Sequence, residues 1–254
     1  MISKLEPRNF GAIFSDTFRI YGRNFLRIIA ITAIVEVFLG VLGYILFEVL
    51  APQAFTSVLE IESLVPLVLM VAIILVASIL TSPLMSGALI HAISEQHFQQ
   101  GIGIGQAYRF SFRRWPAMIG ASILAFLAIA AMAITIIGFL AAIYFIVCWA
   151  FMLQSALLER CGPTAALSRS FALVRRNWWR VFGIMLVIWI ISMLVYFILG
   201  TIPIIGSIIG GILSTPIVVT AATLLYYDLR VRKEGYSLEA LAQELNIKTD
   251  SDIA

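Results

Sequence analysis

The stretch FALVRRNWWRVFGI, residues 171–184, places three arginines and four aromatic rings directly before a long apolar run. Guanidinium groups enter hydrocarbon only at a high cost in free energy, whereas tryptophan rings favour the boundary between lipid and water. The order of these residues therefore predicts a segment that lies on a membrane surface and then continues as a helix into the lipid.

The composition of the whole chain indicates the same environment. Of its 254 residues, 61% are hydrophobic and only 12% are charged, and the mean hydropathy is +1.02. Soluble domains carry about 25% charged residues. The net charge of +3 is modest, and basic residues in a membrane protein first of all set its topology. Nucleic acid is therefore not expected as a partner.

Six apolar runs are long enough for the ~20 helical residues that a bilayer requires. They predict an all-α integral membrane protein with six transmembrane helices. Residues 1–25 are expected to form a cytoplasmic N-terminus with an interfacial helix, and residues 228–254 a cytoplasmic tail with a short amphipathic helix. The expected spans cover about residues 26–50, 64–93, 117–136, 138–158, 181–202 and 207–227.

The positions of the basic residues support this number of spans. All 17 lysines and arginines fall on one side of a six-span topology, and the loops on the other side carry none. A topology with five or seven spans would scatter them over both sides. By the positive-inside rule, both termini are predicted to be cytoplasmic.

Three stretches align without gaps: residues 17–28, 107–118 and 170–181. In residues 17–28 and the turn before them, aromatic and aliphatic residues recur on one helical face and arginines on another. Such a helix lies in the headgroup region, with its rings toward the acyl chains. The alignment predicts three repeated units, each an interfacial amphipathic helix followed by a transmembrane hairpin.

The basic and aromatic columns of this alignment have two interpretations. They anchor the chain and set its topology, or they also bind the phosphate of an anionic lipid headgroup, for which arginine has a suitable fork geometry. The candidates for headgroup contact are Arg19, Arg23, Arg27, Arg109, Arg113, Arg176, Arg180, Trp115 and Trp178.

Acidic residues occupy the cytoplasmic ends of spans two, four and six, at Glu95, Glu159 and Asp228. They are predicted to form a cytoplasmic acidic ring in which each carboxylate pairs with an arginine of the repeated column, namely Arg23, Arg113 and Arg176.

Glu36 is an intramembrane polar residue nine positions beyond Arg27. Because a carboxylate at that depth is costly, it is either a protonated packing residue or a proton- or cation-coupled site. His91 and Glu95, one helical turn apart, resemble half of a metal site, but a closed site needs four ligands. Neither a metal nor a cofactor is expected.

Smaller features predict how the helices pack. Pro83 and Pro216 should kink spans two and six and free backbone carbonyls there. Small residues at Gly206, Gly210 and Ser214 recur every four positions and are expected to pack within the monomer rather than across a dimer. The tail places Leu238, Leu241 and Leu245 on one helical face. That face could lie on the membrane, dock on the cytoplasmic loops or receive a protein partner.

Two segments, SRSFALVRRNWWRVFGI (168–184) and TLLYYDLRVRKEGYSLEAL (223–241), resemble the membrane-domain family of glycerophosphoryl diester phosphodiesterases, as does FSDTFRIYGRNF (14–25). The resemblance covers nearly the whole chain and implies a multi-span protein of the prokaryotic cytoplasmic membrane. Some relatives carry a fused phosphodiesterase domain. Its metal-binding motifs are absent here, so the resemblance implies the fold and the location without that activity.

No catalytic constellation is apparent in the sequence. We therefore expect a non-enzymatic membrane module that organises lipids, chiefly anionic phospholipids, or protein partners through its basic and aromatic cytoplasmic girdle. A transporter or lipid-translocating protein with its polar site at Glu36 is one alternative, and an accessory subunit of a larger membrane complex is another. An oligomer is possible but is not implied.

Overall fold

The computed structural model describes residues 7–54, 64–96, 103–202 and 205–245. Within these ranges the chain is helical and contains no strand, as the apolar runs predicted. The helices are α1 (Phe10–Arg23), α2 (Phe25–Ala54), α3 (Leu64–Glu95), α4 (Ile104–Phe112), α5 (Trp115–Ala133), α6 (Ile136–Cys148), α7 (Met152–Leu157), α8 (Pro163–Val174), α9 (Trp178–Gly200), α10 (Ile205–Glu234) and α11 (Leu238–Leu245).

Five of these helices, α2, α3, α5, α9 and α10, are long and apolar enough to cross a membrane. Large apolar side chains cover their outer surfaces: Val68 is 67% exposed and Met193 70%. A soluble protein rarely exposes so continuous an apolar surface. The chain is therefore an all-α, multi-pass membrane protein.

The fourth expected span is not one continuous helix. Helix α6 has 13 residues and extends only about 20 Å at 1.5 Å per residue. The Ser170 hydroxyl of α8 bridges the break that follows, because its Oγ accepts from the Phe151 amide at 3.1 Å and donates to the Cys148 carbonyl at 2.7 Å. The backbone groups left by the break thus gain partners. A total of six spans stays a prediction.

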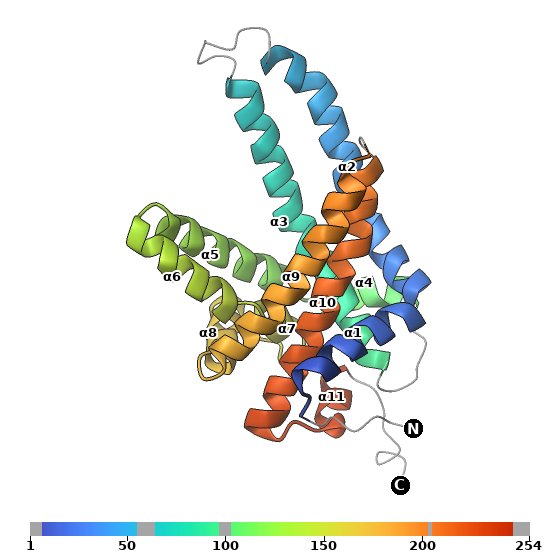
Figure 1. Ribbon diagram of the computed structural model, residues 1–254, viewed down its shortest axis with the longest axis vertical. Coiled ribbons are helices and arrows are strands. Elements are labelled where there is room, and N and C mark those ends of the chain that lie inside the picture. The colour runs from blue at the N-terminus through green and yellow to red at the C-terminus, as the bar shows by residue number, and fades with distance from the viewer. Residues whose placement is uncertain (1–6, 55–63, 97–102, 203–204, 246–254) are drawn as a thin grey trace.

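Helix α10 lies at the centre of the molecule. In the most apolar 18-residue stretch of α10, 61% of the residues are buried, whereas none is buried in the corresponding stretch of α3. Residues 220–230 of α10 are all buried. The hairpins α2–α3 and α9–α10 extend in similar directions, and α5–α6 points away from them (Figure 1). Helices α1 and α11 lie at the end of the molecule opposite the free end of α2–α3 (Figure 1).

A short helix precedes three of the long ones: α1 precedes α2, α4 precedes α5, and α8 precedes α9. The long helices begin at Phe25, Trp115 and Trp178, which occupy one column of the sequence alignment. The local change of direction therefore falls at the same aligned position three times. Because the second hairpin differs from the other two in its broken α6, the repeat of whole units stays a prediction.

The two intrahelical prolines lie beside carbonyls that receive side-chain donors. Pro216 has no N–H for the Ile212 carbonyl, which accepts from Thr32 Oγ1 at 3.2 Å. One residue further on, the Leu213 carbonyl accepts from the Tyr21 hydroxyl at 3.2 Å. At the first proline, Pro83, the Trp115 indole donates to the Leu80 carbonyl at 2.7 Å. Freed or weakened helical carbonyls thus join neighbouring helices.

The small residues of α10 pack inside the monomer, as their spacing predicted. A Cβ added at Gly206 would run into the carbonyl oxygen of Leu199, and one added at Gly210 would lie 3.1 Å from Tyr196 Cδ2. Both neighbours belong to α9. The glycines therefore allow α9 and α10 to approach closely.

This contact predicts that Gly206→Ala destabilises the protein by about 1–3 kcal/mol, because the new methyl group meets backbone rather than a movable side chain. Thermal unfolding in detergent measures the effect. Gly183→Ala in α9 is the matched control, since nothing lies within 4 Å of its added Cβ. The control should be neutral or slightly stabilising, and equal effects of the two changes would contradict the prediction.

Candidate functional site

The acidic residues at the ends of the hairpins do not pair with the predicted arginines. Asp228 pairs with Arg180 at 2.9 Å and with Arg232 at 3.0 Å, and Glu159 pairs with Arg169 at 2.6 Å. Within the described ranges, Arg23, Arg113 and Arg176 make no ion pair, and all three are exposed. The predicted pairing is wrong.

The correct register lies one helical turn further along the chain. Arg180 is the third residue of α9 and reaches Asp228, at the other end of the same hairpin. Arg27, the third residue of α2, is close enough to act electrostatically on Glu95. Arg23, Arg113 and Arg176, which precede the long helices, are exposed, whereas Arg180 in the first turn of α9 is partly buried by its contact with α10. Ala117 holds the equivalent position in the second copy, and Glu159 pairs elsewhere.

Asp228 is the centre of a first polar cluster, which holds the N-terminal segment. Its side chain is fully buried and accepts from the backbone amide of Arg8 at 2.6 Å. The guanidiniums of Arg180 and Arg232 also donate to the Arg8 carbonyl, at 2.6 and 2.7 Å. One buried carboxylate therefore joins the residues before α1 to the start of α9 and the end of α10.

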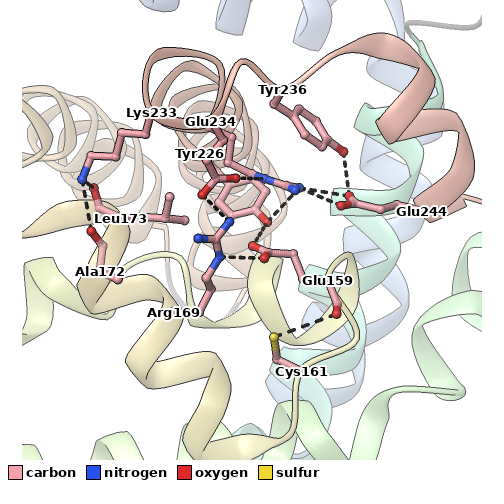
Figure 2. A network of polar contacts seen from close by, with 11 residues as sticks. Glu159, Cys161, Arg169, Ala172, Leu173, Tyr226, Lys233, Glu234, Tyr236 and Glu244 are labelled. Carbon is pink, nitrogen blue, oxygen red and sulfur yellow. Dashed lines mark hydrogen bonds and ion pairs between the residues drawn. The ribbon is translucent and has the colours of Figure 1, made fainter.

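Arg230 is the centre of a second cluster, which holds the tail. It is 7% exposed and donates to both carboxylate oxygens of Glu244 in α11, at 2.9 and 3.1 Å. Its guanidinium lies 3.6 Å from the centroid of the Tyr236 ring. The Tyr236 hydroxyl donates to the same carboxylate at 2.6 Å (Figure 2). Burial raises the pKa of Tyr236 far above its ordinary value, so this hydroxyl stays protonated.

A second branch of this cluster reaches α8. Tyr226 donates to Glu159 at 2.6 Å, and Arg169 joins Glu159 to Glu234 (Figure 2). Lys233 donates to the Ala172 and Leu173 carbonyls at 3.1 and 2.7 Å, near the C-terminal end of α8. A cation there is favourable because helical carbonyls are left without partners.

The apolar face of the tail is occupied by the chain itself. Leu241 is fully buried and Leu245 is 5% exposed, while the side chain of Leu238 lies outside the described residues. Of the three arrangements open from the sequence, the described part of the tail adopts docking on the chain itself, at the end of α10. Glu244 of the tail is paired with Arg230, so the two clusters have a structural role in holding the N-terminal segment and the tail. In the described ranges, no group of three or more His, Cys, Asp or Glu residues could hold a metal.

Three arginines, Arg175, Arg176 and Arg180, line an open hollow of about 670 Å³ where α8 meets α9. Arg175 and Arg176 are both exposed and make no ion pair with the described residues. Trp178 forms part of the wall of this hollow. Its ring is held in place by stacking on Phe182, with centroids 4.9 Å apart, and by a hydrogen bond of 3.2 Å from its indole N–H to the Tyr144 carbonyl. The alignment identified Arg176 and Trp178. It missed Arg175, which matches Gly22 in the first copy.

The second copy forms a smaller hollow of about 270 Å³, lined in part by Arg109, Arg113 and His91. Trp115 uses its indole N–H inside the protein, as described above. In the first copy, Arg19 pairs with Asp16 at 3.1 Å, and Arg23 and Arg27 are exposed. The predicted headgroup residues thus lie in three separate places. Some of their side chains already form hydrogen bonds or ion pairs within the protein.

Glu36 lies between α2 and α10. Its Oε1 accepts from Thr215 Oγ1 at 3.0 Å, and a Cβ at Gly211 would lie 2.5 Å from its Oε2. The hollows of the arginines are lined by other residues. The small residues of α10 therefore make room for Glu36 at a helix contact.

Comparison of this chain with protein-family models, with curated proteins and with solved structures finds no match.

The buried position of Arg230 predicts a large effect of its removal. Arg230→Met should destabilise the protein by about 3–5 kcal/mol, because the Glu244 carboxylate is left without its cation. The double variant Arg230→Met/Glu244→Met should recover part of this loss in thermal unfolding. Arg176→Met, at an exposed arginine without an ion pair, should shift stability by less than about 0.5 kcal/mol. A double variant no more stable than Arg230→Met would contradict the pairing.

Proposed function

We propose that this protein is a non-enzymatic module of a prokaryotic cytoplasmic membrane that binds anionic phospholipids at its cytoplasmic surface. The proposal rests chiefly on one observation: among the described residues, Arg175 and Arg176 have no acidic partner, and both are exposed in a hollow walled by Trp178. Other arginines nearby, such as Arg180, are already neutralised by Asp228.

The chemistry of this hollow suits a phosphate group. Guanidinium groups bind phosphate oxygens with two parallel hydrogen bonds, and a basic residue near an anionic membrane surface contributes about 1 kcal/mol. Indole rings belong at the same depth of the bilayer. The hollow of Arg109 and Arg113 would bind headgroups in the same way.

The contacts of Glu36 weigh against the transporter alternative. Its carboxyl group lies against Gly211 and accepts a hydrogen bond from Thr215, as expected of a packing residue. For an accessory subunit, Leu241 and Leu245 on the apolar face of α11 are already buried within the chain, so a partner would have to bind elsewhere. The family resemblance agrees with the proposed location and with an architecture of three repeated units that together contain six spans. Both remain part of the proposal.

The headgroup site is tested by Arg175→Gln/Arg176→Gln. After extraction from vesicles of equal phosphatidylglycerol and phosphatidylcholine, mass spectrometry measures which lipid stays bound. We expect the enrichment of phosphatidylglycerol to fall by about fivefold per arginine, which corresponds to ~1 kcal/mol each. Arg19→Gln is the control, because Asp16 already neutralises that arginine. An enrichment unaffected by the double change would refute the site.

The proposed orientation predicts which residues are accessible from outside the cell. In a chain lacking Cys148 and Cys161, cysteines replace two exposed residues, Thr201 between α9 and α10 and Glu239 in the tail. A membrane-impermeant thiol reagent should label the Thr201→Cys variant in intact cells and the Glu239→Cys variant only after permeabilisation. The reverse pattern would overturn the orientation.

A further inference from the structure

A cavity deeper than the two arginine-lined hollows lies between α6 and α9. It is an apolar cavity of about 430 Å³ whose walls come from α3, α6, α7, α9 and α10. Apart from Ser86 and Gln154, its lining side chains are aliphatic, aromatic or methionine. Trp189 and Leu186, at its outer wall, are 60% and 42% exposed. In a membrane that exposed surface faces acyl chains, so the cavity is accessible from the lipid.

Gln154 is the unusual member of this lining. The residue is 3% exposed, and its Oε1 has no hydrogen-bond partner. No side-chain hydrogen bond of Gln154 occurs within the described ranges. A buried amide oxygen without a donor is costly, and native structures keep few of them. An apolar side chain of similar size would avoid this cost, so a glutamine here points to a bound molecule that carries a donor.

The required chemistry follows from the site. The molecule must be mostly hydrocarbon, because the walls are apolar, and must bear an O–H group for Gln154 Oε1. A protonated carboxylic acid meets both requirements, since its O–H donates to the amide oxygen while its carbonyl accepts from the amide NH₂. In a cavity without cations, the neutral form of the acid is favoured, because burial disfavours the charged form.

We propose that this cavity binds one long-chain carboxylic acid from the membrane, with its acid group on Gln154 and its chain along the wall formed by Phe182 and Trp189. The phosphate site at Arg175 and Arg176 is separate, so this inference does not depend on the proposed function.

The test compares three probes with the same chain: oleic acid, oleyl alcohol and methyl oleate. Native mass spectrometry of the delipidated protein in mild detergent measures occupancy. Oleic acid should bind most tightly and the alcohol less tightly, because it keeps only the donor. Methyl oleate lacks the O–H group, and its affinity should be lower than that of the acid by about tenfold or more. Equal binding of the acid and the ester would overturn the proposal.

Two variants separate binding from folding. Gln154→Leu should raise the melting temperature of the delipidated protein, because the unpartnered amide is removed, and should abolish the preference for the acid. Ala222→Leu should fill the cavity and reduce the occupancy of all three probes. Ala72→Leu, in a surface hollow between α2 and α3, is the matched control and should change neither. If Gln154→Leu lowers the melting temperature, or leaves the preference intact, Gln154 is a structural residue and the proposal fails.

Discussion

The end of this protein that carries α1 and α11 depends on the burial of a charged helix end. Residues 220–230 of α10 are buried on every side, and they include both Asp228 and Arg230. A buried charge is tolerated only with a well-placed partner. Each of these residues therefore recruits a different part of the chain: Asp228 holds the segment before α1, and Arg230 holds α11. The segment before α1 and helix α11 are positioned by this requirement more than by their own helical propensity.

The sequence predicted the coarse architecture because the properties that determine it are local. Twenty apolar residues in a row define a span whatever their partners are. The spans were expected to begin at about residues 26, 117 and 181, and the helices begin slightly earlier, at the aligned Phe25, Trp115 and Trp178. The docking of the tail was one of three open arrangements, since an amphipathic face does not reveal what covers it. The break after α6 depends on Ser170, a residue of a later helix, and no pattern within residues 138–158 indicates it.

Side-chain pairing was harder to predict. The alignment gave the column of Arg23, Arg113 and Arg176 more weight than the column of Arg27 and Arg180, because it is conserved in all three copies. Within the described ranges, the less regular column supplies one ion pair, Arg180 with Asp228, while Arg27 acts on Glu95 only electrostatically. The most regular column of the alignment thus identified arginines that are exposed at the surface. The buried ion pairs depend on how the helices lie against one another in three dimensions. Gln154 carried no sequence signal, because a single glutamine in an apolar run has many uses.

The shortness of α6 affects the lipid around it. A helix of 13 residues spans about 20 Å, whereas the hydrocarbon core is ~30 Å thick. If the chain crosses the membrane at α6, a helix of this length produces hydrophobic mismatch, which an upright helix meets by drawing the two leaflets together and a tilted one by leaving part of the far leaflet without protein contact. The bilayer would then be thinner or less ordered beside α6 than around α2 and α3. The protein would then collect in membrane regions that already have that thickness.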